Sequence, residues 1–107
     1  MRELVCSVGD LTPGKAAAAE VGGKKVAMVR LQDGTIHAIE DSCSHGSVAL
    51  SEGEVSGCFV KCWLHGSRFD VTTGAPATPP ATAAVLVYPV EIDGEDVYVD
   101  VESPTNI

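Results

Sequence analysis

Two pairs of cysteine and histidine in the middle of this 107-residue chain have the spacing of metal ligands. The first pair is Cys43-x-His45 and the second is Cys62-x-x-His65, with residues 46–61 between them. Thiolates and imidazoles are donors that zinc and iron centres take from proteins. Because each short spacing lets one loop deliver two ligands, we expect two loops that the fold brings together around one metal centre.

The order of the donors distinguishes two kinds of centre. Two thiolates and two imidazoles suit a structural zinc ion, but zinc fingers usually keep cysteine with cysteine and histidine with histidine. Here each loop carries one donor of each type. This order favours a [2Fe–2S] cluster in which two cysteines hold one iron and two histidines hold the other. A zinc-binding module stays the alternative.

Turn signals on both sides of the ligand pairs predict the strands that position them. Gly22-Gly23, Asp33-Gly34 and Asp93-Gly94 each separate two apolar runs, which is typical of β-hairpins. The alanines at 16–19 are too few to form a helix unaided and predict an edge strand. No window has a sustained helical period, so we expect an all-β fold of antiparallel sheets.

The last hairpin shows an alternating apolar pattern. It predicts a first strand whose alternate side chains form one apolar face. The apolar face of its partner strand consists of Val97, Val99 and Val101. The residues of that first face are Leu86, Tyr88, Val90 and Ile92.

Residues 41–80 differ from the rest of the chain and contain both ligand pairs. Short apolar pieces alternate there with Gly, Ser, Thr and Pro, and the stretch closes near GAPATPPAT. A loop region of this length inside a compact domain is usually functional. We therefore expect a single domain, 1–107, with a loop-rich cluster-binding subdomain at about 41–80.

The residues CSHG…KCWLHGSRFD resemble the C-x-H…C-x-x-H signature of the Rieske iron–sulfur family. The whole chain is similar in length and layout to the stand-alone Rieske ferredoxins of bacterial ring-hydroxylating dioxygenase systems. The resemblance implies one [2Fe–2S] cluster. Cys43 and Cys62 would bind its inner iron, and His45 and His65 its outer iron nearer the solvent.

Five further residues would surround the cluster. Two glycines would let backbone N–H groups approach the cluster sulfurs, a serine would donate a hydrogen bond, and a tryptophan and a proline would cover the cluster or form a docking spot. These residues are Gly46, Gly66, Ser67, Trp63 and Pro79.

Two departures from the high-potential respiratory members of that family imply a low reduction potential. Phe69 stands where those members have a tyrosine that donates to sulfur. Those members also have an additional disulfide, whose cysteines would fall near Val48 and at Leu64, and this chain has no cysteine at either position. Each missing donor leaves more electron density on the cluster. The expected midpoint is about −150 mV.

Composition excludes several partners. The net charge is −8 and the seven basic residues are dispersed, so we expect no binding to nucleic acid or to anionic membranes. The N-terminal sequence has no long apolar run, which indicates a cytoplasmic protein. An acidic chain suits a basic partner, and the acidic residues near the loops are candidates for steering it: Asp41, Glu52, Glu54 and Asp70.

Three donors outside the signature are expected to be structural. Cys6 and Cys58 are predicted to be small buried hydrophobes, and His37 a histidine on the surface of a sheet. A mononuclear iron site would need two further histidines, and only His37 is left, so we expect no catalysis by this chain alone.

The resemblance implies a monomeric one-electron carrier. It would move electrons from an NAD(P)H-dependent flavoprotein ferredoxin reductase to a terminal Rieske oxygenase that hydroxylates an aromatic ring. A small Rieske-like subunit of an assimilatory nitrite reductase is the second alternative.

Overall fold

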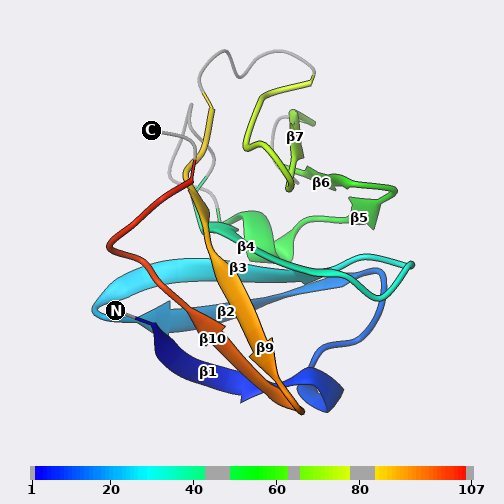
Figure 1. The fold of residues 1–107 in the computed structure, drawn as a ribbon. Helices are drawn as coiled ribbons and strands as arrows, with labels where there is room; N and C mark the ends of the chain where they lie inside the picture. Colours follow the sequence, from blue (N-terminus) through cyan, green and yellow to red (C-terminus); the bar gives the residue numbers. More distant parts are fainter. Residues whose placement is uncertain (1, 43–48, 63–65, 78–83, 106–107) are drawn as a thin grey trace.

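The computed structural model describes residues 2–42, 49–62, 66–77 and 84–105 (Figure 1). Their regular elements are ten strands and two short 3-10 helices: β1 (Glu3–Ser7), η1 (Val8–Asp10), β2 (Lys15–Val21), β3 (Lys24–Arg30), β4 (Ile36–Glu40), η2 (Leu50–Glu52), β5 (Val55–Ser56), β6 (Phe59–Lys61), β7 (Arg68–Asp70), β8 (Val87–Tyr88), β9 (Val90–Asp93) and β10 (Asp96–Val99). The predicted all-β class is confirmed. None of the helices in these four ranges is long or apolar enough to cross a membrane.

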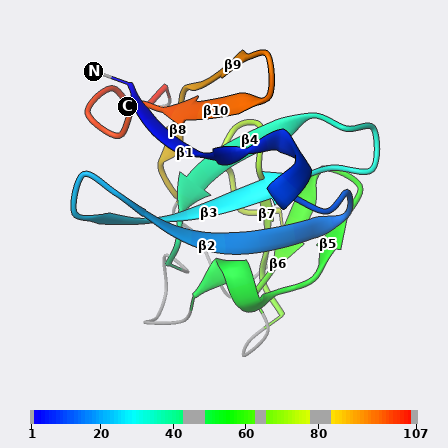
Figure 2. The same cartoon turned by 90° about the horizontal axis from the view of Figure 1, so that it is seen from below.

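The strands form three antiparallel sheets. Their strand orders are β1-β10-β9, β2-β3-β4-β8 and β5-β6-β7. Figure 1 shows the small β5-β6-β7 sheet at one end of the molecule, with η2 between it and the two larger sheets. Seen from below in Figure 2, β1 passes in front of β4, and β9 and β10 lie beside the β2-β3-β4 layer.

The three predicted hairpins are present. Val21 pairs with Lys24 across Gly22 and Gly23, whose φ angles of 56° and 80° are those of a type I′ turn that glycine forms without steric cost. The alanine-rich segment is strand β2, at the edge of its sheet as predicted.

The prediction of one continuous strand over 86–92 is wrong. Pro89 has no N–H to donate, and the chain changes sheets there: Tyr88 pairs with β4, whereas Val90 pairs with β10. Ile92 is 48% exposed at the sheet edge, so it does not share a buried face with Tyr88.

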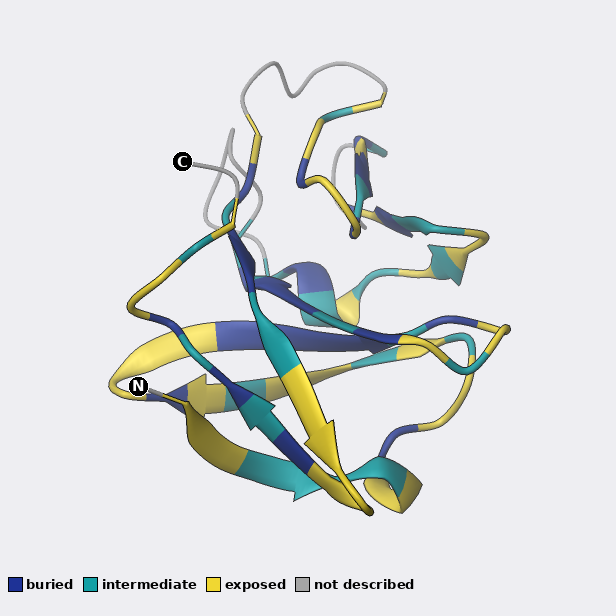
Figure 3. Ribbon diagram, in the orientation of Figure 1, coloured by how far each residue is buried: buried dark blue, intermediate teal, exposed yellow. Residues whose placement is uncertain are grey.

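Two apolar cores lie on opposite faces of the four-stranded sheet. Val26 and Met28 of β3 point into the core shared with the β1-β10-β9 sheet, and Ala27 and Val29 point into the core shared with the small sheet. Because both faces of β3 are covered, its sequence is a continuous apolar run. Figure 3 shows this strand as buried along most of its length. The second core therefore connects the four-stranded sheet to the small sheet that carries Cys62.

Candidate metal centre

The small sheet presents the second predicted ligand loop. Val60 of β6 and Phe69 of β7 are directly opposite each other, and both are fully buried in the second core. Lys61 and Arg68 form the next pair and are exposed, since successive side chains of a strand point to opposite faces. Cys62 follows β6 and is 0% exposed.

Two backbone hydrogen bonds close the loop from Cys62 to Ser67. The N–H of Cys62 donates to the carbonyl of Ser67 at 2.6 Å, and the N–H of Gly66 donates to the carbonyl of Cys62 at 2.9 Å. Gly66 has a φ of 78°, a conformation that side chains with a Cβ disfavour. Ser67 is fully buried beside Cys62. The two ends of this loop are therefore held together by backbone hydrogen bonds.

The first predicted ligand loop is closed at its base by Asp41, which lies just after β4. Oδ1 of Asp41 accepts a hydrogen bond from the N–H of Ser51 at 2.7 Å, and Oδ2 accepts one from the Ser51 hydroxyl at 2.8 Å. Asp41 is only 7% exposed, and Leu50 beside Ser51 is fully buried. Because both oxygens of the Asp41 carboxylate are hydrogen-bonded to Ser51, this carboxylate is not available to steer a partner.

A close backbone approach joins the two ligand loops. Gly53 ends η2, and a Cβ at this position would overlap the carbonyl oxygen of Lys61, the residue before Cys62. The N–H of Lys61 also donates to the carbonyl of Glu54 at 2.8 Å. The chain leaving the first loop is thus held against the strand that enters the second.

The base of the proline-rich loop is attached to the same sheet. The N–H of Ala77 donates to the carbonyl of Arg68 at 2.7 Å, and Pro76 forms a β-bridge with Phe69. On the other side of the loop, the N–H of Val85 donates to the carbonyl of Gly74 at 2.9 Å. The residues on both sides of this loop are therefore held in register with β7.

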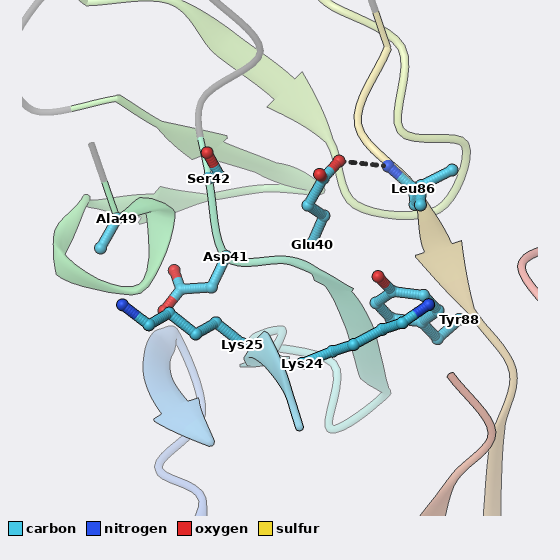
Figure 4. Close-up of a pocket in the computed structure, with 8 residues that line it drawn as sticks. All are labelled: Lys24, Lys25, Glu40, Asp41, Ser42, Ala49, Leu86 and Tyr88. Atoms are coloured by element: carbon cyan, nitrogen blue, oxygen red, sulfur yellow. Dashed lines mark hydrogen bonds between the residues drawn. The ribbon is translucent and has the colours of Figure 1, made fainter. Parts of the chain in front are cut away.

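Glu40 connects the end of β4 to the chain that leaves the proline-rich loop. Figure 4 shows its carboxylate accepting a hydrogen bond from the backbone N–H of Leu86, at 3.1 Å. The N–H of Glu40 donates to the carbonyl of Leu86 at 2.8 Å. Beside this contact, Lys25, Asp41 and Ser42 contribute to the lining of a groove of about 510 Å³. All three predicted loops around the centre thus begin and end at hydrogen-bonded positions.

Only part of the predicted site falls within the described residues. Cys62, Gly66 and Ser67 lie there, in one closed loop of the small sheet. The others lie outside them: Cys43, His45, Gly46, Trp63, His65 and Pro79. In the part of the chain that the structure describes, no three histidine, cysteine or acidic side chains are grouped to hold a metal ion, and the four-ligand set stays a prediction.

Sequence reasoning missed the residues that hold the loop bases. Asp41 was read as a charge near the surface, and neither Ser51 nor Gly53 stood out. The only signal for Gly53 is its place between a short helix and a strand, which does not reveal the carbonyl that it packs against.

Burial shifts the pKa values of His37 and Cys6, two donors outside the signature, in opposite directions. His37 is half-buried in β4, and burial lowers the pKa of its imidazole below the ordinary value of 6.5. Its Nε2 lies 3.2 Å from the Thr35 hydroxyl. Cys6 and Cys58 are partly buried free thiols packed against the two cores, and burial raises the pKa of Cys6.

The surroundings of Cys62 fit an iron–sulfur cluster. Its thiol is free of any disulfide and shielded from water, and its backbone is hydrogen-bonded to Gly66 and Ser67. Among the described residues, a Cβ on Gly66 would meet only the Cε of Lys61, at 3.8 Å, so there is space beside this glycine. An apolar shell that excludes water is an environment that tunes such clusters.

Comparison with known proteins also indicates an iron–sulfur domain. Residues 2–89 match the Rieske [2Fe-2S] domain family. The chain is 42% identical over 96 residues to the biphenyl dioxygenase ferredoxin subunit of Pseudomonas sp. (strain KKS102), covering 89% of this chain and 87% of that one. It superposes with a TM-score of 0.85 and 37% identity on a chain from the complex of reduced oxygenase and oxidized ferredoxin in carbazole 1,9a-dioxygenase, covering 92% of this chain and 100% of that chain.

A third match shows the fold alone. The structure of a putative NADH-dependent nitrite reductase small subunit from Mycobacterium tuberculosis has a TM-score of 0.84, at 24% identity, covering 92% of this chain and 93% of that one.

Proposed function

Because the chain belongs to the Rieske [2Fe-2S] domain family, we propose that it is the one-electron carrier of a multicomponent aromatic-ring oxygenase. The observation that carries this proposal is the likeness, over almost the whole of both chains, to a ferredoxin subunit of biphenyl dioxygenase. Cys62 supports it, because a shielded thiol whose backbone is held by hydrogen bonds to Gly66 and Ser67 suits a cluster ligand.

The [2Fe–2S] cluster supplies the one-electron chemistry when it is bound. Cys62 would hold it together with Cys43, His45 and His65. The contribution of the chain is rigidity, since a ligand shell that moves little on reduction lets an electron enter and leave with little reorganisation. The hydrogen bond from Ser51 to Asp41 holds the base of the first ligand loop, and the one from Cys62 to Ser67 holds the base of the second.

The proposed partners are a flavoprotein ferredoxin reductase, fed by NADH or NADPH, and a terminal Rieske oxygenase. The second is supported by the carbazole 1,9a-dioxygenase complex, in which a ferredoxin of similar fold is associated with its oxygenase. The chain would act as a monomer in the cytoplasm and have no catalytic site of its own. Its encounters should be brief, because the carrier must leave one partner to reach the next.

A low reduction potential is part of the proposal. Phe69 is fully buried in the core that contains Cys62, and it has no hydroxyl to donate to a sulfur. Fewer donors to the cluster lower its potential, which suits an electron source for an oxygenase. The midpoint should lie near the bottom of the Rieske range, at about −150 mV.

The test is electron paramagnetic resonance of the anaerobically purified protein, before and after dithionite, with iron and acid-labile sulfide counted on the same sample. A silent oxidised state, a rhombic signal after reduction and two irons per chain are expected. A colourless protein with one zinc ion would overturn the proposal in favour of a structural module. Copurification with a large nitrite reductase subunit would replace the oxygenase as its partner.

A further inference from the structure

The outward face of the small sheet carries two cations next to the second ligand loop. Lys61 of β6 and Arg68 of β7 are directly opposite each other, and both are exposed. They come immediately before Cys62 and after Ser67, so they bracket the loop that holds the predicted ligands. Two of the seven basic residues of a chain with a net charge of −8 thus stand together at this place.

Sheet stability does not explain this pair. Like charges directly opposite on neighbouring strands destabilise a sheet, and an acidic residue at either position would have formed a favourable pair. Lys61 also lies close to the loop itself, since its Cε is 3.8 Å from the position that a Cβ of Gly66 would take. The positive charge therefore stands beside the loop that binds the cluster.

The pair borders a small groove. The groove has a volume of about 130 Å³, and besides Lys61 and Arg68 it is lined by Phe59, Ser56 and Glu54. A half-buried aromatic ring beside two cations suits a side chain that combines an apolar stem with a carboxylate. Arginine binds carboxylates through two parallel hydrogen bonds, which adds geometric selectivity to the charge attraction.

The acidic residues once expected to steer a partner are partly committed elsewhere. Asp41 is buried on Ser51, and Asp70 accepts hydrogen bonds from the N–H and hydroxyl of Thr72, at 2.9 and 2.5 Å. Lys61 and Arg68 are exposed on the strands that flank the ligand loop.

We propose that the outward face of β6 and β7, centred on Lys61 and Arg68, is a docking surface for an acidic segment of a redox partner protein. This inference rests on the proposed function, since it assigns the place where a partner approaches the carrier. An acidic segment at this face would lie beside the ends of the loop from Cys62 to Ser67.

Small oxidants of opposite charge test this surface without a known partner. The reduced holoprotein gives one electron to ferricyanide, forming ferrocyanide, or one electron to hexaammineruthenium(III), forming the ruthenium(II) complex. Both rates are measured by stopped flow for the native protein and for Lys61→Gln, Arg68→Gln and the double variant. Lys15→Gln, which removes an exposed charge from β2 of the four-stranded sheet, is the matched control.

The expected effects have opposite signs for the two oxidants. A trivalent ion roughly 10 Å from each removed charge, at about 0.1 M ionic strength, should react about twofold more slowly per cation if it is ferricyanide, and about twofold faster if it is the ruthenium complex. The double variant should therefore change the ratio of the two rates roughly 20-fold. Lys15→Gln should change the ratio much less, because Lys15 belongs to another sheet and does not line this groove.

A polymer tests the chemistry of the partner. Polyglutamate should slow the oxidation of the native protein and of Lys15→Gln by ferricyanide, and it should have no effect on the double variant. Equal rate ratios in the double variant and in Lys15→Gln would overturn the proposal, and so would competition by polylysine in place of polyglutamate. A protein without a reducible cluster would instead refute the proposed function, so the two failures are distinct.

Discussion

Asp41 and Ser51 form a double hydrogen bond across the first ligand loop. Both carboxylate oxygens are used, at 2.7 Å to the Ser51 N–H and 2.8 Å to the Ser51 hydroxyl, and Asp41 is 7% exposed. Residues 42–50, which lie between the two partners, include Cys43 and His45. An acceptor of this kind is costly to lose because the donors that it satisfies are left without a partner.

Replacing Asp41 with alanine should destabilise the protein and loosen the first ligand loop. We expect a loss of about 2 kcal/mol in the free energy of unfolding, measured with denaturant. Asp41→Asn keeps one acceptor oxygen and should lose about half as much. Iron should leave Asp41→Ala faster in the presence of a chelator. Glu52→Gln, an exposed neighbour, is the control, and equal stability of it and Asp41→Ala would contradict the assignment.

Gly53→Ala should disturb both ligand loops at once. The backbone of Gly53, with φ −85° and ψ 173°, is one that alanine adopts freely, so the effect comes only from the overlap with the Lys61 carbonyl. Overlaps of this kind cost about 1 to 3 kcal/mol and shift the backbone. Denaturant unfolding should show the loss, and the electron paramagnetic resonance signal of the reduced protein should broaden.

Gly9→Ala is the control for this substitution. A Cβ at Gly9 meets nothing within 4 Å, and its φ does not lie in the left-handed region. If both variants kept the native stability and signal, the approach of Gly53 to Lys61 would not be what joins the loops.

Local turn chemistry predicts three strand pairings of this fold, β2 with β3, β3 with β4 and β9 with β10. Gly22-Gly23 forces a tight turn whatever surrounds it, and the strands on its two sides then pair in the register that the turn sets. The break in the strand over 86–92 was not predictable, because the apolar alternation continues through Pro89. Only the pairing of Tyr88 with β4 and of Val90 with β10 shows where the chain changes sheets.

The sequence predicts the donors of the site, but it does not predict the contacts that support their loops. Cys62 is recognised by its residue type and its spacing from His65, which are properties of the sequence. The contacts of Asp41 with Ser51 and of Gly53 with Lys61 join residues from different elements, and no local pattern encodes them. The same holds for the cation pair, since only the register of β6 and β7 places Lys61 opposite Arg68.

Stability should depend on pH through His37. Burial lowers the pKa of its imidazole in the folded protein, so the unfolded chain binds the proton more readily. The contribution is fully present above the unfolded pKa, about 6.5, and it is lost as the pH falls from there towards the folded pKa. The free energy of unfolding should therefore decrease as the pH is lowered below neutrality, and His37→Gln should have a flatter profile. Parallel profiles of the two proteins would contradict this.

Asp70 acts in a separate, more acidic range. Burial alone would raise the pKa of its carboxyl, but the hydrogen bonds from Thr72 outweigh it and lower the pKa below the ordinary value of 3.8. The stability that it contributes is present above the unfolded pKa and is lost as the pH falls through the folded pKa. Asp70→Asn should therefore differ from the native protein in pH dependence only below about pH 4, in the same denaturant measurement.

The reduction potential should rise in Phe69→Tyr. The ring is fully buried and opposite Val60, in the core that contains Cys62, so a hydroxyl added to it must find a partner inside the protein. If that partner is a sulfur of the cluster or of its cysteine ligand, the donor withdraws electron density and the midpoint becomes more positive.

A hydroxyl without a partner would have a different signature. It would cost about 1 to 3 kcal/mol of stability and leave the potential unchanged. A redox titration followed by circular dichroism, together with denaturant unfolding, distinguishes the two outcomes. Phe59→Tyr, on the outward side of the same small sheet, should change neither quantity. We expect a raised midpoint with little loss of stability; a native midpoint in a variant whose hydroxyl is shown to point at sulfur would refute this explanation of the low potential.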